Sequence, residues 1–124
     1  MNQILVHNLT RPKIPPITAH YCDSFLCRLR GLMFRRSIPD DWGLLLVQGS
    51  DSRLDTAIHM LAMWIDLGVV WINSQGKVVD TRHARRWRPA YLPASPAQYI
   101  LEMNVAHLGD FAVGDRIQFE HTHS

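Results

Sequence analysis

The longest apolar stretch of the chain runs from Thr56 to Val79, and a single turn sequence, Asn73-Ser-Gln-Gly76, interrupts it. Apolar runs of about four to eight residues that end in turn residues are typical of buried strands. We therefore predict strands over residues 57–62 and 67–73. The turn then leads into a third strand over 77–83, which forms a hairpin with the second.

The rest of the chain predicts more short strands and little helix. These strands fall at residues 4–6, 43–48, 98–103 and 116–120. Asp23 or Ser24 can cap one short helix that Gly31 ends, and Asn104 can cap one further turn. We predict a mostly β, β-rich α+β fold of about seven short strands and one or two short helices. Its architecture would be a compact antiparallel β-sandwich or distorted barrel.

Length and composition predict one domain over residues 1–124, with a Pro-rich N-terminal arm over 1–16 and a frayed tail over 121–124. A formal charge of +2 is too small to indicate a nucleic-acid partner. The apolar run 57–72 is shorter than the roughly 20 residues of a membrane helix and contains an acidic residue. With no signal sequence seen at the start, we expect a cytoplasmic protein that contacts no membrane.

The two cysteines, Cys22 and Cys27, lie five residues apart next to the predicted helix. On a helix this spacing separates two side chains by about 140° around the axis, which is poor geometry for a disulfide. We therefore predict two small buried thiols in a reducing compartment.

Three blocks of sequence together resemble a known family. They are Arg30-Gly-Leu-Met-Phe-Arg35, then Ile58-His-Met-Leu-Ala-Met63 followed by Val69-Val-Trp-Ile-Asn73 and Gly76-Lys-Val-Val79, and finally Tyr99-Ile-Leu-Glu-Met103 with Gly114-Asp115. Their order and spacing resemble the small prokaryotic family catalogued as domain of unknown function 192, from about Cys27 to Phe119. The resemblance implies a compact β-rich fold with a short packed helix, and it implies no reaction. Where family members carry a Pro-hydrophobic-Asp step, this chain has Asp66-Leu67-Gly68, so the acid stands two residues earlier and the proline is absent.

Two residues of the central block suggest metal chemistry. His59 and Met63 lie four apart and would share one face of the predicted strand 57–62. An imidazole and a thioether are ligands that suit Cu(I), but a site needs a third ligand, from His83, His107 or a cysteine. The alternative is a core histidine satisfied by a backbone carbonyl beside a packing methionine. We favour that alternative and predict neither a metal nor another cofactor.

A cluster of arginines around one tryptophan follows the predicted hairpin. Its members are Arg85, Arg86, Trp87 and Arg88. Guanidinium groups bind phosphate or carboxylate in a bidentate manner, and an indole stacks on a base or a sugar. The alternative, which we favour, is a solvated loop in which the tryptophan covers the edge of the sheet.

Among the acidic residues, Asp66 stands inside the apolar block, where burial would raise its pKa. The favoured alternative places Asp66 in a wet turn between two strands. Glu102 is the other acid that we consider for proton transfer. Arg30 is expected to form a structural ion pair with Glu102 or Asp115.

Three classes of function fit these features. We favour a binding or accessory module without chemistry of its own, which takes a small anionic or sugar-like ligand, or a protein, in a cleft near His59 and the arginines. The first alternative is a hydrolase-like enzyme that uses Asp66 or Glu102 with His59. The second is a structural or oligomerising protein. The candidate site residues are His59, Met63, Asp66, Arg85, Arg86, Trp87, Arg88 and Glu102.

Overall fold

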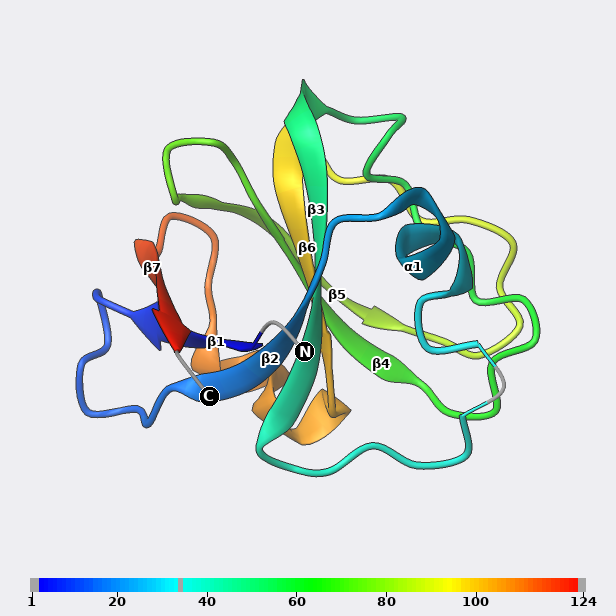
Figure 1. Ribbon diagram of the computed structural model, residues 1–124, viewed down its shortest axis with the longest axis horizontal. Helices are drawn as coiled ribbons and strands as arrows, with labels where there is room; N and C mark the ends of the chain where they lie inside the picture. The colour runs from blue at the N-terminus through cyan, green and yellow to red at the C-terminus, as the bar shows by residue number, and fades with distance from the viewer. Residues whose placement is uncertain (1–2, 34, 123–124) are drawn as a thin grey trace.

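The computed structural model describes residues 3–33 and 35–122, and within these ranges the strands form one seven-stranded sheet (Figure 1). Its strand order is β5-β4-β6-β3-β2-β1-β7. The elements are β1 (Gln3–Asn8), β2 (Ile17–Cys22), α1 (Phe25–Arg30), β3 (Trp42–Ser52), β4 (Leu67–Ile72), β5 (Val78–Ala84), β6 (Ala97–Met103), the 3-10 helix η1 (Val105–Asp110) and β7 (Ile117–Thr122). The predicted β-rich α+β fold class is confirmed.

The sheet curls until its two outermost strands approach each other. Val78 at the start of β5 donates its N–H to the carbonyl of Asp115, and Ile117 at the start of β7 donates to the carbonyl of Gly76. Gly76 adopts φ +80°, and a Cβ there would lie 2.8 Å from the Ile117 carbonyl oxygen, so this approach requires glycine. The result is a distorted barrel. All of its strand pairs are antiparallel except β2–β3, which is parallel.

Side chains alternate along the strands and build a separate hydrophobic core on each face of the sheet. The barrel core contains Ile4, Val6, Ile17, Ala19, Leu45, Val47, Val70, Ile72, Val78, Leu101, Met103, Phe111 and Ile117. The outer core contains Cys22, Leu32, Ile38, Leu44, Leu46, Ile58, Met60, Met63, Leu67, Val69, Trp71, Ala84, Ala97 and Ile100. In Figure 1, α1 lies on one side of β3 and β6, whereas β1 and β7 lie on the other.

The outer core is covered by α1 and by residues 57–66, which we call the cover segment. The predicted strand over 57–62 is wrong, because this segment is a loop that makes one isolated bridge, between Ile58 and Tyr91. Met60 instead exchanges backbone hydrogen bonds with the loop after β5, accepting from Trp87 at 2.7 Å and donating to Arg88 at 2.9 Å. The apolar residues of this segment are therefore buried because they pack on the sheet, and not because they form one of its strands.

Both ends of the described chain take part in the sheet. β1 lies inside the sheet between β2 and β7, so residues 3–8 are not a separate arm. His121 and Thr122 pair with β1 as part of β7, and residues 123–124 of the predicted tail lie outside the described residues. β2, which the sequence did not predict, runs parallel to β3.

Cys22 and Cys27 form a disulfide, so the prediction of two separate thiols is wrong. The helical spacing argument fails because Cys22 is the last residue of β2, and α1 begins only at Phe25. The turn between them brings the two Cα atoms to 5.7 Å. The expectation of a reducing compartment rested on two free thiols, and the disulfide removes that basis. The predicted helix itself is confirmed, with Ser24 as its N-cap.

Candidate functional site

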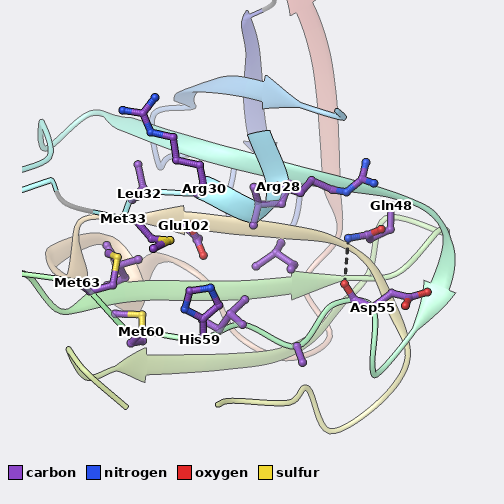
Figure 2. Close-up of a pocket in the computed structure, with 16 residues that line it drawn as sticks. Arg28, Arg30, Leu32, Met33, Gln48, Asp55, His59, Met60, Met63 and Glu102 are labelled. Atoms are coloured by element: carbon purple, nitrogen blue, oxygen red, sulfur yellow. Dashed lines mark hydrogen bonds between the residues drawn. The ribbon is translucent and has the colours of Figure 1, made fainter. Parts of the chain in front are cut away.

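A small pocket of about 80 Å³ lies in the outer core, between the C-terminal end of α1, the cover segment and β6 (Figure 2). It is lined by Arg28, Arg30, Gly31, Leu32, Met33, Leu46, Gln48, Asp55, Ala57, Ile58, His59, Met60, Met63, Leu67, Ile100 and Glu102. One water needs roughly 10–15 Å³ of such volume, so the pocket has room for several waters or for a small chemical group.

Glu102 is the buried polar group of this pocket. It sits on β6 between Leu44 of β3 and Val69 of β4, and its side chain is directed into the outer core. The residue is only 5% exposed. Its Oε1 atom has no hydrogen-bond partner in the part of the chain that the structure describes. Because burial disfavours the charged form, the pKa of Glu102 is raised to about 7.

The end of α1 leaves space directly over this carboxyl group. Gly31 ends the helix with φ +50°, and a Cβ at this position would lie 3.6 Å from Oε1 of Glu102. The expected ion pair with Arg30 is not formed: the Arg30 side chain is exposed, and Oε1 stays unpaired. Asp115, the other expected partner, pairs instead with Arg11, whose Nε lies 3.1 Å from Oδ2. Arg28 and Arg30 of α1 both line the pocket, but within the described chain neither forms an ion pair with Glu102.

Three methionines and several polar side chains line the pocket together with Glu102. The side chains of Met33, Met60 and Met63 lie around the same space as the Glu102 carboxyl group (Figure 2). Met60 and Met63 are 1% and 2% exposed, whereas His59 is exposed to solvent. Two residues of the lining are joined by a hydrogen bond, in which Nε2 of Gln48 donates to the backbone carbonyl of Asp55 at 2.9 Å. The predicted pair His59 and Met63 thus shares a pocket, although it does not share a strand.

Asp66 lies outside this pocket, just before β4. Its Oδ1 accepts hydrogen bonds from the backbone N–H and the Nε of Arg86, at 2.9 and 3.1 Å, and its Oδ2 lies 3.0 Å from Nε2 of His83. The backbone N–H of Arg86, followed by His83, lowers the pKa of Asp66 to about 2. A raised pKa for this residue is therefore wrong, because the cover segment turns it outward toward two partners.

The arginine cluster after β5 is exposed and lies outside the lining of the Glu102 pocket. Trp87 adopts φ +67°, and its ring makes an edge contact with Trp64, with centroids 5.6 Å apart. Arg86 is engaged with Asp66, while Arg85 and Arg88 extend along the same exposed loop. Of the candidates taken from the sequence, the structure brings together His59, Met63 and Glu102, and it places the other five elsewhere.

Most of the lining was not among the sequence candidates, and Gly31, Met33 and Met60 are the omitted residues that matter most for the chemistry of the pocket. All three stand in the sequence blocks that resemble the family, and that position was the only signal that pointed to them. Across residues 3–33 and 35–122, the structure contains no cluster of three or more His, Cys, Asp or Glu side chains that could hold a metal. His83 and His107, the proposed third ligands, instead face Asp66 and Asp110. Among the described residues, no helix is long and apolar enough to cross a membrane.

Comparisons with known proteins agree with the resemblance in the sequence. A family model described as "Uncharacterized ACR, COG1430" matches residues 7–119. A UPF0127 protein of Thermococcus gammatolerans is 33% identical over 120 residues, covering 95% of this chain and 76% of the relative. Another, from Pyrococcus furiosus, is 32% identical over 114 residues, covering 90% of this chain and 95% of the relative.

Two crystal structures share the fold. One is a protein from Sinorhizobium meliloti 1021 that was proposed to be a transcription regulator, with TM-score 0.79, 22% identity and coverage of 95% of this chain and 92% of the other. The second is a protein of unknown function from Novosphingobium aromaticivorans, with TM-score 0.74, 18% identity and coverage of 94% and 83%. At these identities the likeness shows the fold alone.

Proposed function

We propose that this chain, which belongs to the uncharacterised family known as domain of unknown function 192, is a module that binds a small ligand in the pocket above Glu102. The observation that carries this proposal is the orphaned Oε1 atom of a carboxyl group that is 95% buried. An unsatisfied buried polar atom costs about 1–3 kcal/mol, and more when it is charged. A ligand that satisfies this atom recovers that free energy on binding.

The carboxyl group limits the chemistry of the ligand. Oε1 is satisfied by a hydrogen-bond donor, such as the hydroxyl of a sugar-like compound, or by a cation. An anion is compatible with Glu102 only while the carboxyl group is protonated, below its pKa of about 7. The volume of about 80 Å³ admits only a small compound, or one small group of a larger compound. Hydroxylated and cationic ligands therefore fit the pocket better than anionic ones.

An enzyme remains the second candidate, on the observation that Glu102 and His59 line the same pocket. A carboxyl group with a pKa near 7 suits general acid–base catalysis at neutral pH. Asp66 does not support this alternative, because its pKa is lowered and its oxygens are bound to Arg86 and His83. Turnover of a bound ligand that disappears in Glu102→Gln and His59→Asn would favour the enzyme over the binding module.

Thermal unfolding against a panel of polyols, amines, small anions and metal ions tests the proposal. A ligand at about 100 times its Kd raises the free energy of unfolding by about 2.7 kcal/mol, which shifts the Tm by several degrees at this size. Glu102→Gln keeps the shape of the side chain and should abolish the shift. Asp66→Asn is the matched control outside the pocket and should retain it. A shift of the same size in Glu102→Gln would show that the ligand binds elsewhere.

A further inference from the structure

Three of the five methionines in the chain line one pocket, together with a histidine and an unpaired carboxyl group. Met60 and Met63 come from the cover segment, and Met33 comes from the turn after α1. Met103 is as deeply buried as Met60, but it faces the barrel core on the opposite side of the sheet. Three of the four methionines in the described chain therefore lie on the face that also holds Glu102.

Packing alone explains part of this arrangement. Methionine fills irregular space in a core, so buried thioethers need no further cause. Packing does not explain why a carboxyl group lies among them with one oxygen unpaired, since a hydrophobic residue of similar volume would avoid the loss of solvation. Thioether sulfurs are weak hydrogen-bond acceptors and cannot donate to Oε1. A cation that also binds thioether sulfur would satisfy both Oε1 of Glu102 and the methionines.

We infer that the pocket is a site for a soft monovalent cation, Cu(I), bound by the thioethers of Met60 and Met63, with Glu102 as the countercharge. Met33 and His59 stand at the same pocket and complete the set of ligands. This inference rests on the proposed function and specifies its ligand. The metal is the bound ligand of the module, and no redox step is assigned to it.

Ligand chemistry and charge balance both favour Cu(I) over the common divalent ions. Thioethers select Cu(I), whereas Mg²⁺ and Ca²⁺ require several oxygen ligands. The thioethers carry no charge, and the charged side chains of the lining are Glu102, Asp55, Arg28 and Arg30. The pocket therefore supplies little net negative charge, which suits a monovalent cation better than a divalent one. A divalent ion would retain excess charge in a site with low solvent exposure. Cys22 and Cys27 are joined in a disulfide, so no free thiolate of the chain competes for the metal.

The test is an anaerobic titration of the whole chain with Cu(I), in competition with a chromophoric Cu(I) chelator and without thiol reductants. Ag(I) serves as a redox-inert probe of the same site. We expect a single equivalent to bind. Because changes in residues that only orient metal ligands already weaken binding about 10–100-fold, the double variant Met60→Leu/Met63→Leu should lose at least about 100-fold. Glu102→Gln should also weaken binding, and Met103→Leu should leave it unchanged.

Leucine has nearly the volume of methionine, so the variants should fold, and their Tm values without metal check this. Binding that persists in Met60→Leu/Met63→Leu would overturn the inference and point to exposed histidines. Failure of the wild type to retain Cu(I) or Ag(I) would also overturn it. If a polyol or an amine then still gives a stabilisation that depends on Glu102, the proposed function stands without the metal. If no compound stabilises the protein in a way that depends on Glu102, the proposed function and the Cu(I) inference both fail.

Discussion

The two faces of the sheet use the same strands and yet differ in chemistry. On β6, Leu101 and Met103 point into the barrel core and are fully buried among apolar side chains. Glu102, between them, points to the outer face and lies beside the pocket. The barrel core is enclosed by the curled sheet itself, whereas the outer core is covered by α1 and the cover segment. Glu102 and the pocket thus lie on the face that is covered by α1 and a loop. Strands pack at a regular spacing, whereas these covering segments do not.

The largest expected effect comes from a cavity in the barrel core. Leu101→Ala should lower the free energy of unfolding by about 2–5 kcal/mol, toward the upper end, because strands on every side prevent collapse around the cavity. Met63→Ala, in the cover segment, should lie toward the lower end, because a loop can relax into the space. Urea unfolding of both variants measures the difference. Equal losses would show that the cover segment is packed as rigidly as the sheet.

Glu102 should make the stability of the outer face depend on pH. Burial raises its pKa from 4.5 to about 7, so between these values the folded state holds a proton that the unfolded state has lost. The contribution of Glu102 to stability is therefore fully present below about pH 4.5 and is lost as the pH rises to about 7, by about 3 kcal/mol at roughly 1.4 kcal/mol per pKa unit. Urea unfolding of wild type and Glu102→Gln at pH 5 and pH 8 isolates this contribution. Parallel profiles for the two proteins would contradict it.

The disulfide tests how firmly α1 is attached to the outer face. Replacing Cys22 and Cys27 by alanine removes a crosslink that closes a short loop, and the chain-entropy estimate for such a loop is about 2 kcal/mol. We expect a loss of that size in thermal or urea unfolding. Faster hydrogen exchange in residues 25–31 than in β6 would accompany it. Unchanged exchange in α1 would indicate that packing, rather than the crosslink, fixes the helix.

The barrel core was easier to predict from sequence than the outer face, and the reason is physical. The hairpin at Asn73–Gly76 and the strands around Leu45 and Leu101 follow from short apolar runs bounded by turn residues, which are local signals. The cover segment was mistaken for a strand because an apolar run gives the same pattern whether it pairs within a sheet or packs on it.

The pocket depends on contacts between distant parts of the chain. Met33, Met60 and Glu102 are 27 to 69 positions apart in the sequence, and no local pattern records that they meet. The disulfide was missed for a related reason, since its geometry depends on where β2 ends. The candidates His59 and Met63 were found through their ligand chemistry, although the strand that was to align them does not exist. The chemistry of individual side chains therefore pointed to His59 and Met63, whereas the full set of pocket residues becomes visible only in the folded structure.

The smallest effect concerns Asp66, which joins the cover segment to the exposed loop after β5 through Arg86. Its pKa is lowered from 3.8 to about 2, so its contribution to stability is complete above about pH 4 and is lost as the pH falls toward 2, opposite in sign to that of Glu102. Because both partners are largely exposed, Asp66→Asn should lose only about 1 kcal/mol at pH 7, and the difference from wild type should vanish near pH 2. Urea unfolding at the two pH values measures it. A loss comparable to that of Leu101→Ala would mean that this ion pair, rather than apolar packing, holds the cover segment on the sheet.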